Sequence, residues 1–76
     1  MTRPRYFTST GQHDSDAVYL RHDSKSGDCV VVTATGERPP NFIPWPLSES
    51  LRLVQLGLLR EISWSEAARL LRDARQ

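Results

Sequence analysis

GERPPNFIPWP, residues 36–46, divides the chain into two halves with different hydrophobic patterns. Its four prolines remove backbone donors and bias the residues before them toward extended geometry, so we expect neither a helix nor a central strand here. The stretch predicts a semi-rigid extended crossover. Phe42, Ile43 and Trp45 are too apolar for a solvated linker. Either they pin the crossover to the sheet or the helices, or they form an exposed aromatic surface that binds a partner.

The half before the crossover has the composition of a β-sheet. Residues 5–10 are rich in aromatic and β-branched side chains, and residues 16–22 alternate between apolar and polar side chains. Residues 28–35 contain three consecutive valines, which is typical of a strand that is covered on both faces or placed centrally. Because polar turn residues separate the segments, the sequence predicts a three-stranded antiparallel meander over about residues 5–35.

The half after the crossover has helical spacing. A first helix is expected over about residues 47–61, where apolar residues recur along one stripe: Leu47, Leu51, Val54, Leu58 and Ile62. Gly57 lowers the helix propensity by about 1 kcal/mol relative to alanine, and we interpret it as a close helix crossing. A second helix is expected over about residues 64–75, with an apolar stripe of its own: Trp64, Ala67, Ala68, Leu71 and Ala74.

The start of the second helix carries the clearest local signal. Ser63 and Glu66 have the spacing of a capping box, and Ile62 and Ala67 are placed as a hydrophobic staple. Taken together, the pattern predicts an α+β fold in one small domain spanning residues 1–76. A three-stranded antiparallel meander is followed by a proline-rich crossover and by two C-terminal helices packed on the sheet.

Composition limits the classes of function. The chain has 76 residues and a net charge of +1, which excludes an arginine-rich nucleic-acid arm and an acidic mimic of DNA, and leaves little room for an enclosed active site. The single cysteine, Cys29, permits no internal disulfide and indicates a reducing compartment. No N-terminal apolar run resembles a signal peptide, and no stretch is apolar enough to span a bilayer. We expect a cytoplasmic protein without membrane contact.

Arginine supplies nearly all of the positive charge, and three arginines recur at helical spacing: Arg69, Arg72 and Arg75. The planar guanidinium suits carboxylate and phosphate contacts, so this strip is a candidate partner-binding surface. Positive charge near the end of a helix is also favoured by the helix dipole, without any partner.

Further contact candidates lie at aromatic and exposed apolar positions. Trp45 and Phe42 in the crossover are natural interface anchors. Leu56 falls beside Arg52 on the side of the first predicted helix where solvent is expected, although single exposed leucines are common. We take all four residues as candidate partner-binding residues.

Catalytic and metal sites find little support. Pairing of residue 22 with residue 28 would place Cys29 opposite Arg21, which could activate the thiol, but no third orienting group is evident. Histidine and aspartate residues gather around the two predicted hairpin loops without the spacing of a known metal site: His13, Asp14, Asp16, His22, Asp23 and Asp28. Turn chemistry explains these aspartates. We expect no enzyme activity, cofactor, metal or small-molecule substrate.

Residues 65–71 resemble the first helix of many helix-turn-helix proteins. That family pattern requires a glycine-containing turn and a recognition helix after this segment. Residues 72–76 provide neither, so we assign no base-reading residue by this resemblance.

Three hypotheses follow from these features. The first is a small non-catalytic regulator that docks on a larger protein assembly and modulates, or more specifically inhibits, its activity. Such a regulator could be encoded by a mobile element and act on host machinery such as transcription. The length of the chain is the basis for this hypothesis, and no residue bears on it. The alternative is a nucleic-acid-binding accessory protein that uses the arginine-rich C-terminal helix. An enzyme using Cys29 or a loop metal is the third.

Overall fold

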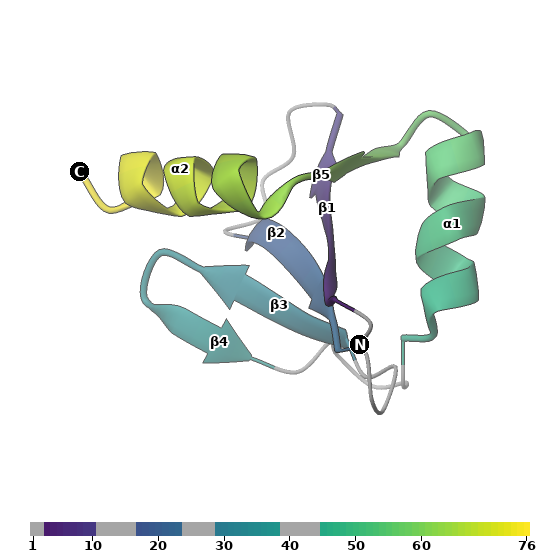
Figure 1. Cartoon of the computed structure of the whole chain (residues 1–76), viewed down its shortest axis with the longest axis horizontal. Helices are drawn as coiled ribbons and strands as arrows, with labels where there is room; N and C mark the ends of the chain where they lie inside the picture. The colour runs from purple at the N-terminus through teal and green to yellow at the C-terminus, as the bar shows by residue number, and fades with distance from the viewer. Residues whose placement is uncertain (1–2, 11–16, 24–28, 39–44) are drawn as a thin grey trace.

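The computed structural model describes residues 3–10, 17–23, 29–38 and 45–76. It has an α+β fold in which an antiparallel sheet is combined with two helices (Figure 1). The strands are β1 (Arg5–Ser9), β2 (Ala17–His22), β3 (Cys29–Thr33), β4 (Gly36–Arg38) and β5 (Leu59–Ile62), and the helices are α1 (Leu47–Gln55) and α2 (Trp64–Ala74).

The sheet has five strands in the order β4-β3-β2-β1-β5, and every neighbouring pair is antiparallel. β1, β2 and β3 correspond to the predicted three-stranded meander, but the sheet has two further strands. The sequence analysis did not predict the two edge strands. β4 occupies residues that were assigned to the crossover, and residues 39–44, including Phe42, lie outside the described residues, so the crossover stays a prediction.

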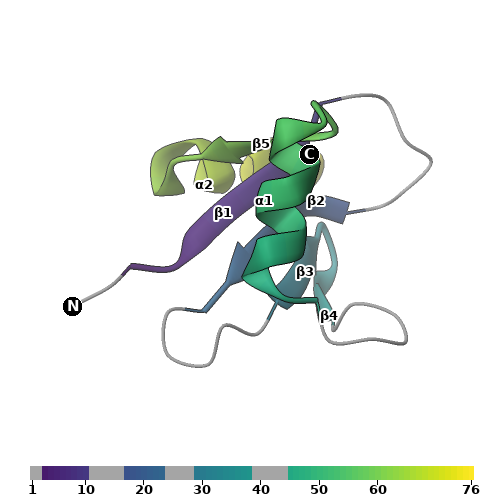
Figure 2. The ribbon, with the colours of Figure 1, turned by 90° about the vertical axis from the view of Figure 1, so that its right-hand side faces the viewer.

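The two helices cover opposite faces of the sheet, as Figures 1 and 2 show together. One face carries Tyr19, Val32 and Ile62, which form a buried cluster with Ala67 of α2. Tyr19 pairs with Val32 across β2 and β3, so their side chains point to the same face. On the other face, His22 of β2 contacts Ser50 of α1. Val31 and Val32 are both buried, and β3 is therefore covered on both faces as the valine run predicts.

The first helix ends six residues earlier than the predicted residue 61. Gly57 has a φ of +79°, in the left-handed region that glycine adopts without a steric penalty. Its amide donates to Val54 O at 3.0 Å, and the amide of Leu58 donates to Leu53 O at 2.9 Å. These two bonds form a Schellman motif, which satisfies the last carbonyls and turns the chain away from the helix. The prediction that Gly57 marks a helix crossing is wrong.

After this turn the chain continues as β5, so the predicted apolar stripe of the first helix is also wrong. β5 pairs with β1, with Ile62 opposite Tyr6 and Leu59 opposite Ser9. Ile62 is buried, but as a residue of β5 and not of a helix, while Leu51 and Leu58 of the expected stripe are exposed. β5 also separates α1 from α2, so these two helices are not joined by the short turn of a helix-turn-helix arrangement.

The second helix begins as predicted, but only half of the capping box forms. Ser63 Oγ accepts a hydrogen bond from the Glu66 amide at 3.2 Å. The Glu66 carboxylate accepts from Arg60 of β5 instead of returning to the Ser63 amide. Ile62 and Ala67 are buried in the same cluster, consistent with the staple. In the part of the chain that the structure describes, neither helix has the length and hydropathy needed to cross a bilayer.

The Schellman turn predicts a stability cost for any side chain at position 57. Gly57→Ala should lower the free energy of unfolding by about 1–2 kcal/mol, because a Cβ disfavours the left-handed conformation through contacts with the local backbone, although no atom beyond the two adjacent residues lies within 4 Å of it. Gly57→Asn should cost less, because asparagine tolerates this region better. Urea denaturation of the three proteins measures both effects. Equal stability of wild type and Gly57→Ala would show that the turn does not need the glycine.

Candidate functional site

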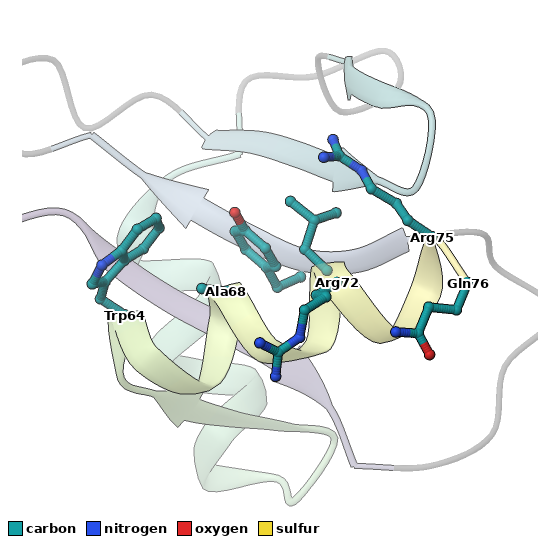
Figure 3. Close-up of a pocket in the computed structure, with 7 residues that line it drawn as sticks. Trp64, Ala68, Arg72, Arg75 and Gln76 are labelled. Carbon is teal, nitrogen blue, oxygen red and sulfur yellow. The ribbon is translucent and has the colours of Figure 1, made fainter.

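A groove of about 390 Å³ lies between α2 and the face of the sheet that α2 covers (Figure 3). Trp64 stands at one end, Ala68 lies in the middle, and Arg75 and Gln76 stand at the other end. One strand and α2 with the residues after it supply its lining: Tyr19, Trp64, Ala68, Leu71, Arg72, Arg75 and Gln76. The groove is therefore aromatic and apolar at one end and cationic at the other.

Aromatic contacts hold the apolar end of the groove. The ring of Tyr6 meets the ring of Tyr19 edge-on at a centroid distance of 5.7 Å and lies 5.8 Å from Trp64. Trp64 is nevertheless 63% exposed. Burial raises the pKa of the Tyr19 hydroxyl, with a further contribution from Tyr6, so the hydroxyl stays neutral and can donate or accept a hydrogen bond. One face of the indole is supported by the protein and much of the rest meets solvent.

Two of the three arginines in the predicted strip line the groove, and their side chains point in different directions (Figure 3). Arg75 Nε donates to the carbonyl of Ala34 at 3.2 Å, which fixes this side chain over the turn between β3 and β4. Arg72 makes no ion pair with any of the residues that the structure describes. Both guanidinium groups therefore keep donors for a partner outside the chain.

Arg69, the third member of the strip, is separated from the groove. Its Nη2 lies 3.5 Å from Glu66 Oε1, and Glu66 also accepts two hydrogen bonds of 3.1 Å from Arg60. The hydrogen bonds from Arg60, with the charges of Arg60 and Arg69, hold the pKa of Glu66 below its usual range. The strip is thus divided between a salt-bridge cluster, formed by Arg60, Glu66 and Arg69, and the cationic end of the groove.

Trp45 lies on the opposite side of the sheet and has a structural contact. Its indole Nε1 donates to Ser50 Oγ of α1 at 2.9 Å, and the same oxygen is 2.7 Å from His22 Nε2 of β2. Ser50 is fully buried and His22 is 2% exposed. Although a serine and a histidine at this distance resemble an activated nucleophile, attack on a substrate requires access. We interpret Trp45, Ser50 and His22 as a buried polar link that fastens α1 to the sheet.

The other predicted contact residues lie on or just after α1. Arg52 forms an ion pair with Glu49 on the same helix. Leu56, at the end of this helix, is 59% exposed, and Leu58 beyond the turn is 50% exposed. The structure therefore keeps Arg52 and Leu56 at the surface but on a different element from the groove. They form a second exposed site and not a continuation of the first.

Cys29 is buried and does not have the predicted neighbour. His22 pairs with Cys29 and Arg21 pairs with Val30, so the expected register is wrong by one residue. Burial raises the pKa of the Cys29 thiol to about 11, which opposes formation of a thiolate. Within the described ranges, no group of three histidine, cysteine, aspartate or glutamate residues is placed to hold a metal ion.

The sequence analysis did not propose five of the seven residues that line the groove: Tyr19, Trp64, Ala68, Leu71 and Gln76. Trp64 was assigned to the buried stripe of α2, but that face is centred on Ala67, with Leu70 and Leu71 packed beside it. Tyr19 was placed only as a member of a strand. The run of arginines was a sufficient signal for the cationic end, whereas the apolar end depends on where α2 crosses the sheet.

Comparisons with known proteins give no further guide to this site. No protein-family model matches the chain, and neither does any curated protein or solved structure.

The buried polar link generates a prediction about stability. Ser50→Ala should lower the free energy of unfolding by about 1–3 kcal/mol, because it leaves the Trp45 indole N–H and His22 Nε2 without this partner. Combining it with Trp45→Phe should cost less than the sum of the single changes. Chemical denaturation of the double-mutant cycle measures the coupling. Strictly additive changes would contradict a shared hydrogen-bond link.

Burial of the Cys29 thiol predicts slow alkylation of the folded protein. At pH 8 the folded protein should react far more slowly with iodoacetamide than the protein unfolded in urea, because burial and the raised pKa both suppress the reactive thiolate. Mass spectrometry of timed samples measures the two rates. Similar rates in the folded and unfolded protein would show that Cys29 is accessible and reactive.

Proposed function

We propose that the protein is a small non-catalytic regulator that binds a larger protein assembly through the groove on α2 and inhibits it. The observation that carries the proposal is Trp64, which is 63% exposed at the edge of a groove that also contains Arg72 and Arg75. Tryptophan and arginine are the residue types that most often dominate the binding energy of protein interfaces. A large indole held in place by Tyr6 loses little conformational freedom when it binds.

The charge arrangement supports a protein partner over a nucleic acid. Continuous binding to phosphates draws on several unpaired cations along one surface. Here Arg69 and Arg60 share the carboxylate of Glu66, and Arg21 donates to Glu37 at 2.7 Å. Arg72 and Arg75 are therefore two separate cations next to apolar and aromatic surface, which suits a protein interface better than a nucleic-acid backbone.

The proposal is tested by capturing partners with a tagged protein from its source cell and quantifying them by mass spectrometry at low and high salt. Trp64→Ala should weaken capture of the principal partner by about 2 kcal/mol or more, roughly 30-fold in affinity. Joint charge reversal of Arg69, Arg72 and Arg75 should weaken it as well. Leu56→Ala and Arg52→Glu change exposed residues of α1 and should have little effect.

Controls and the activity of the partner complete this test. Circular dichroism and thermal unfolding should show that each variant is folded. Adding the wild-type protein to the captured assembly should lower the activity of that assembly, and Trp64→Ala should not. Loss of capture with the α1 variants, but not with the groove variants, would move the binding surface to α1. Capture of nucleic acid alone, with a steep salt dependence, would favour the alternative function.

A further inference from the structure

We propose that the groove on α2 takes one linear segment of a partner protein, in which an aromatic side chain has carboxylates on one side of it. This inference rests on the proposed function and specifies the chemistry of the partner. It is carried by the different character of the two ends of the groove, with Trp64 at one end and Arg75 at the other (Figure 3).

The middle of the groove has space for a side chain. Ala68 lies between Trp64 and the arginines, and its methyl group leaves the surface above it open. Tyr19 and Leu71 supply aromatic and aliphatic surface around this position. A volume of about 390 Å³ is at the small end of the range for ligand pockets, which is about 300–1,000 Å³. An aromatic side chain placed here would stack against Trp64 and remove apolar surface from water.

The arginines of the groove favour negatively charged residues next to this aromatic side chain in the bound segment. No carboxylate-bearing side chain lines the groove among the residues that the structure describes. The carboxylates of Glu66 and Glu37 are engaged by Arg60 and Arg21, so neither is available to neutralise the cationic end. Arg75 uses Nε for the Ala34 carbonyl, and its terminal nitrogens can still donate to an external acceptor. Carboxylates are the complementary partner groups.

The length of α2 sets the length of the segment. The helix has 11 residues, which corresponds to about 16 Å. An extended peptide of about five residues spans this distance. A segment with one central aromatic residue, and with acidic residues on the side that faces Arg72 and Arg75, therefore matches the groove.

The experiment titrates the full ¹⁵N-labelled protein with short synthetic peptides and follows its two indole N–H signals by NMR. A peptide with one phenylalanine and glutamates on one side of it should shift the Trp64 signal in a saturable way. The Trp45 signal is an internal control, because that indole donates to Ser50 on the opposite side of the sheet. Peptides with glutamine in place of glutamate, or with alanine in place of phenylalanine, should bind with an affinity that is lower by about tenfold or more.

Matched variants test the role of charge. Arg72→Glu should weaken binding of the acidic peptide by about tenfold or more, and it should improve binding of a peptide in which lysines replace the glutamates. Arg52→Glu makes the same change in net charge on α1, and binding should stay close to that of wild type. Equal losses in the two variants would show that only the overall charge matters and would overturn the proposal.

Three other outcomes would also overturn it. The first is a larger shift of the Trp64 signal with a DNA or RNA oligonucleotide than with the acidic peptide. The second is a shift on increasing the protein concentration alone, which would make a second copy the occupant. The third is no response to any peptide. If Trp64 and Arg72 are nevertheless required for partner capture from the cell, the proposed function stands and only the chemistry of the segment is wrong.

Discussion

The arrangement of this protein depends on the left-handed turn at Gly57. Because the chain reverses there, the four residues after Leu58 can add to the sheet beside β1 instead of extending α1. That strand carries the chain to Ser63, where α2 begins on the face opposite to α1. A continuous helix through residue 57 would remove β5 and, with it, the position of Trp64 next to Tyr6. The groove is thus a consequence of one backbone conformation several residues away from it.

Much of the α+β class could be predicted from local chemistry, and the errors also have local causes. The valines of β3 and the cap at Ser63 are signals that short-range physics determines. β5 was missed because Leu59, Arg60 and Glu61 are good helix formers and Ile62 continues the helical spacing. Pairing with β1 overrides that propensity. The glycine was the one local sign of the helix end, since glycine is common just after the last helical residue.

The candidate site could be predicted only in part, because it is assembled across elements. Arg72 and Arg75 were identified from spacing along one helix. Their separation from Arg69 depends on Glu66, whose carboxylate turns toward Arg60 on β5. The exposure of Trp64 depends on which face of α2 packs on the sheet, and that face is centred on the buried Ala67. The spacing of residues within one helix or strand predicts neither this ion pair between elements nor the packing of α2 on the sheet. For Trp45 the sequence left two interpretations open, and its hydrogen bond to Ser50 of α1 fits the one in which it pins the chain to a helix.

The charged residues of β5 also bear on how copies of the protein meet. β5 and β4 are the two edges of the sheet, and an unpaired edge is a template on which another chain can add a strand. Both edges are short, with four and three residues, and both carry charged side chains: Arg60 and Glu61 on β5, Glu37 and Arg38 on β4. Arg60 and Glu61 are held by Glu66 and Arg5 on opposite faces of the sheet. The ion pairs that position the helices and strands therefore also oppose the edge-to-edge pairing from which aggregates grow.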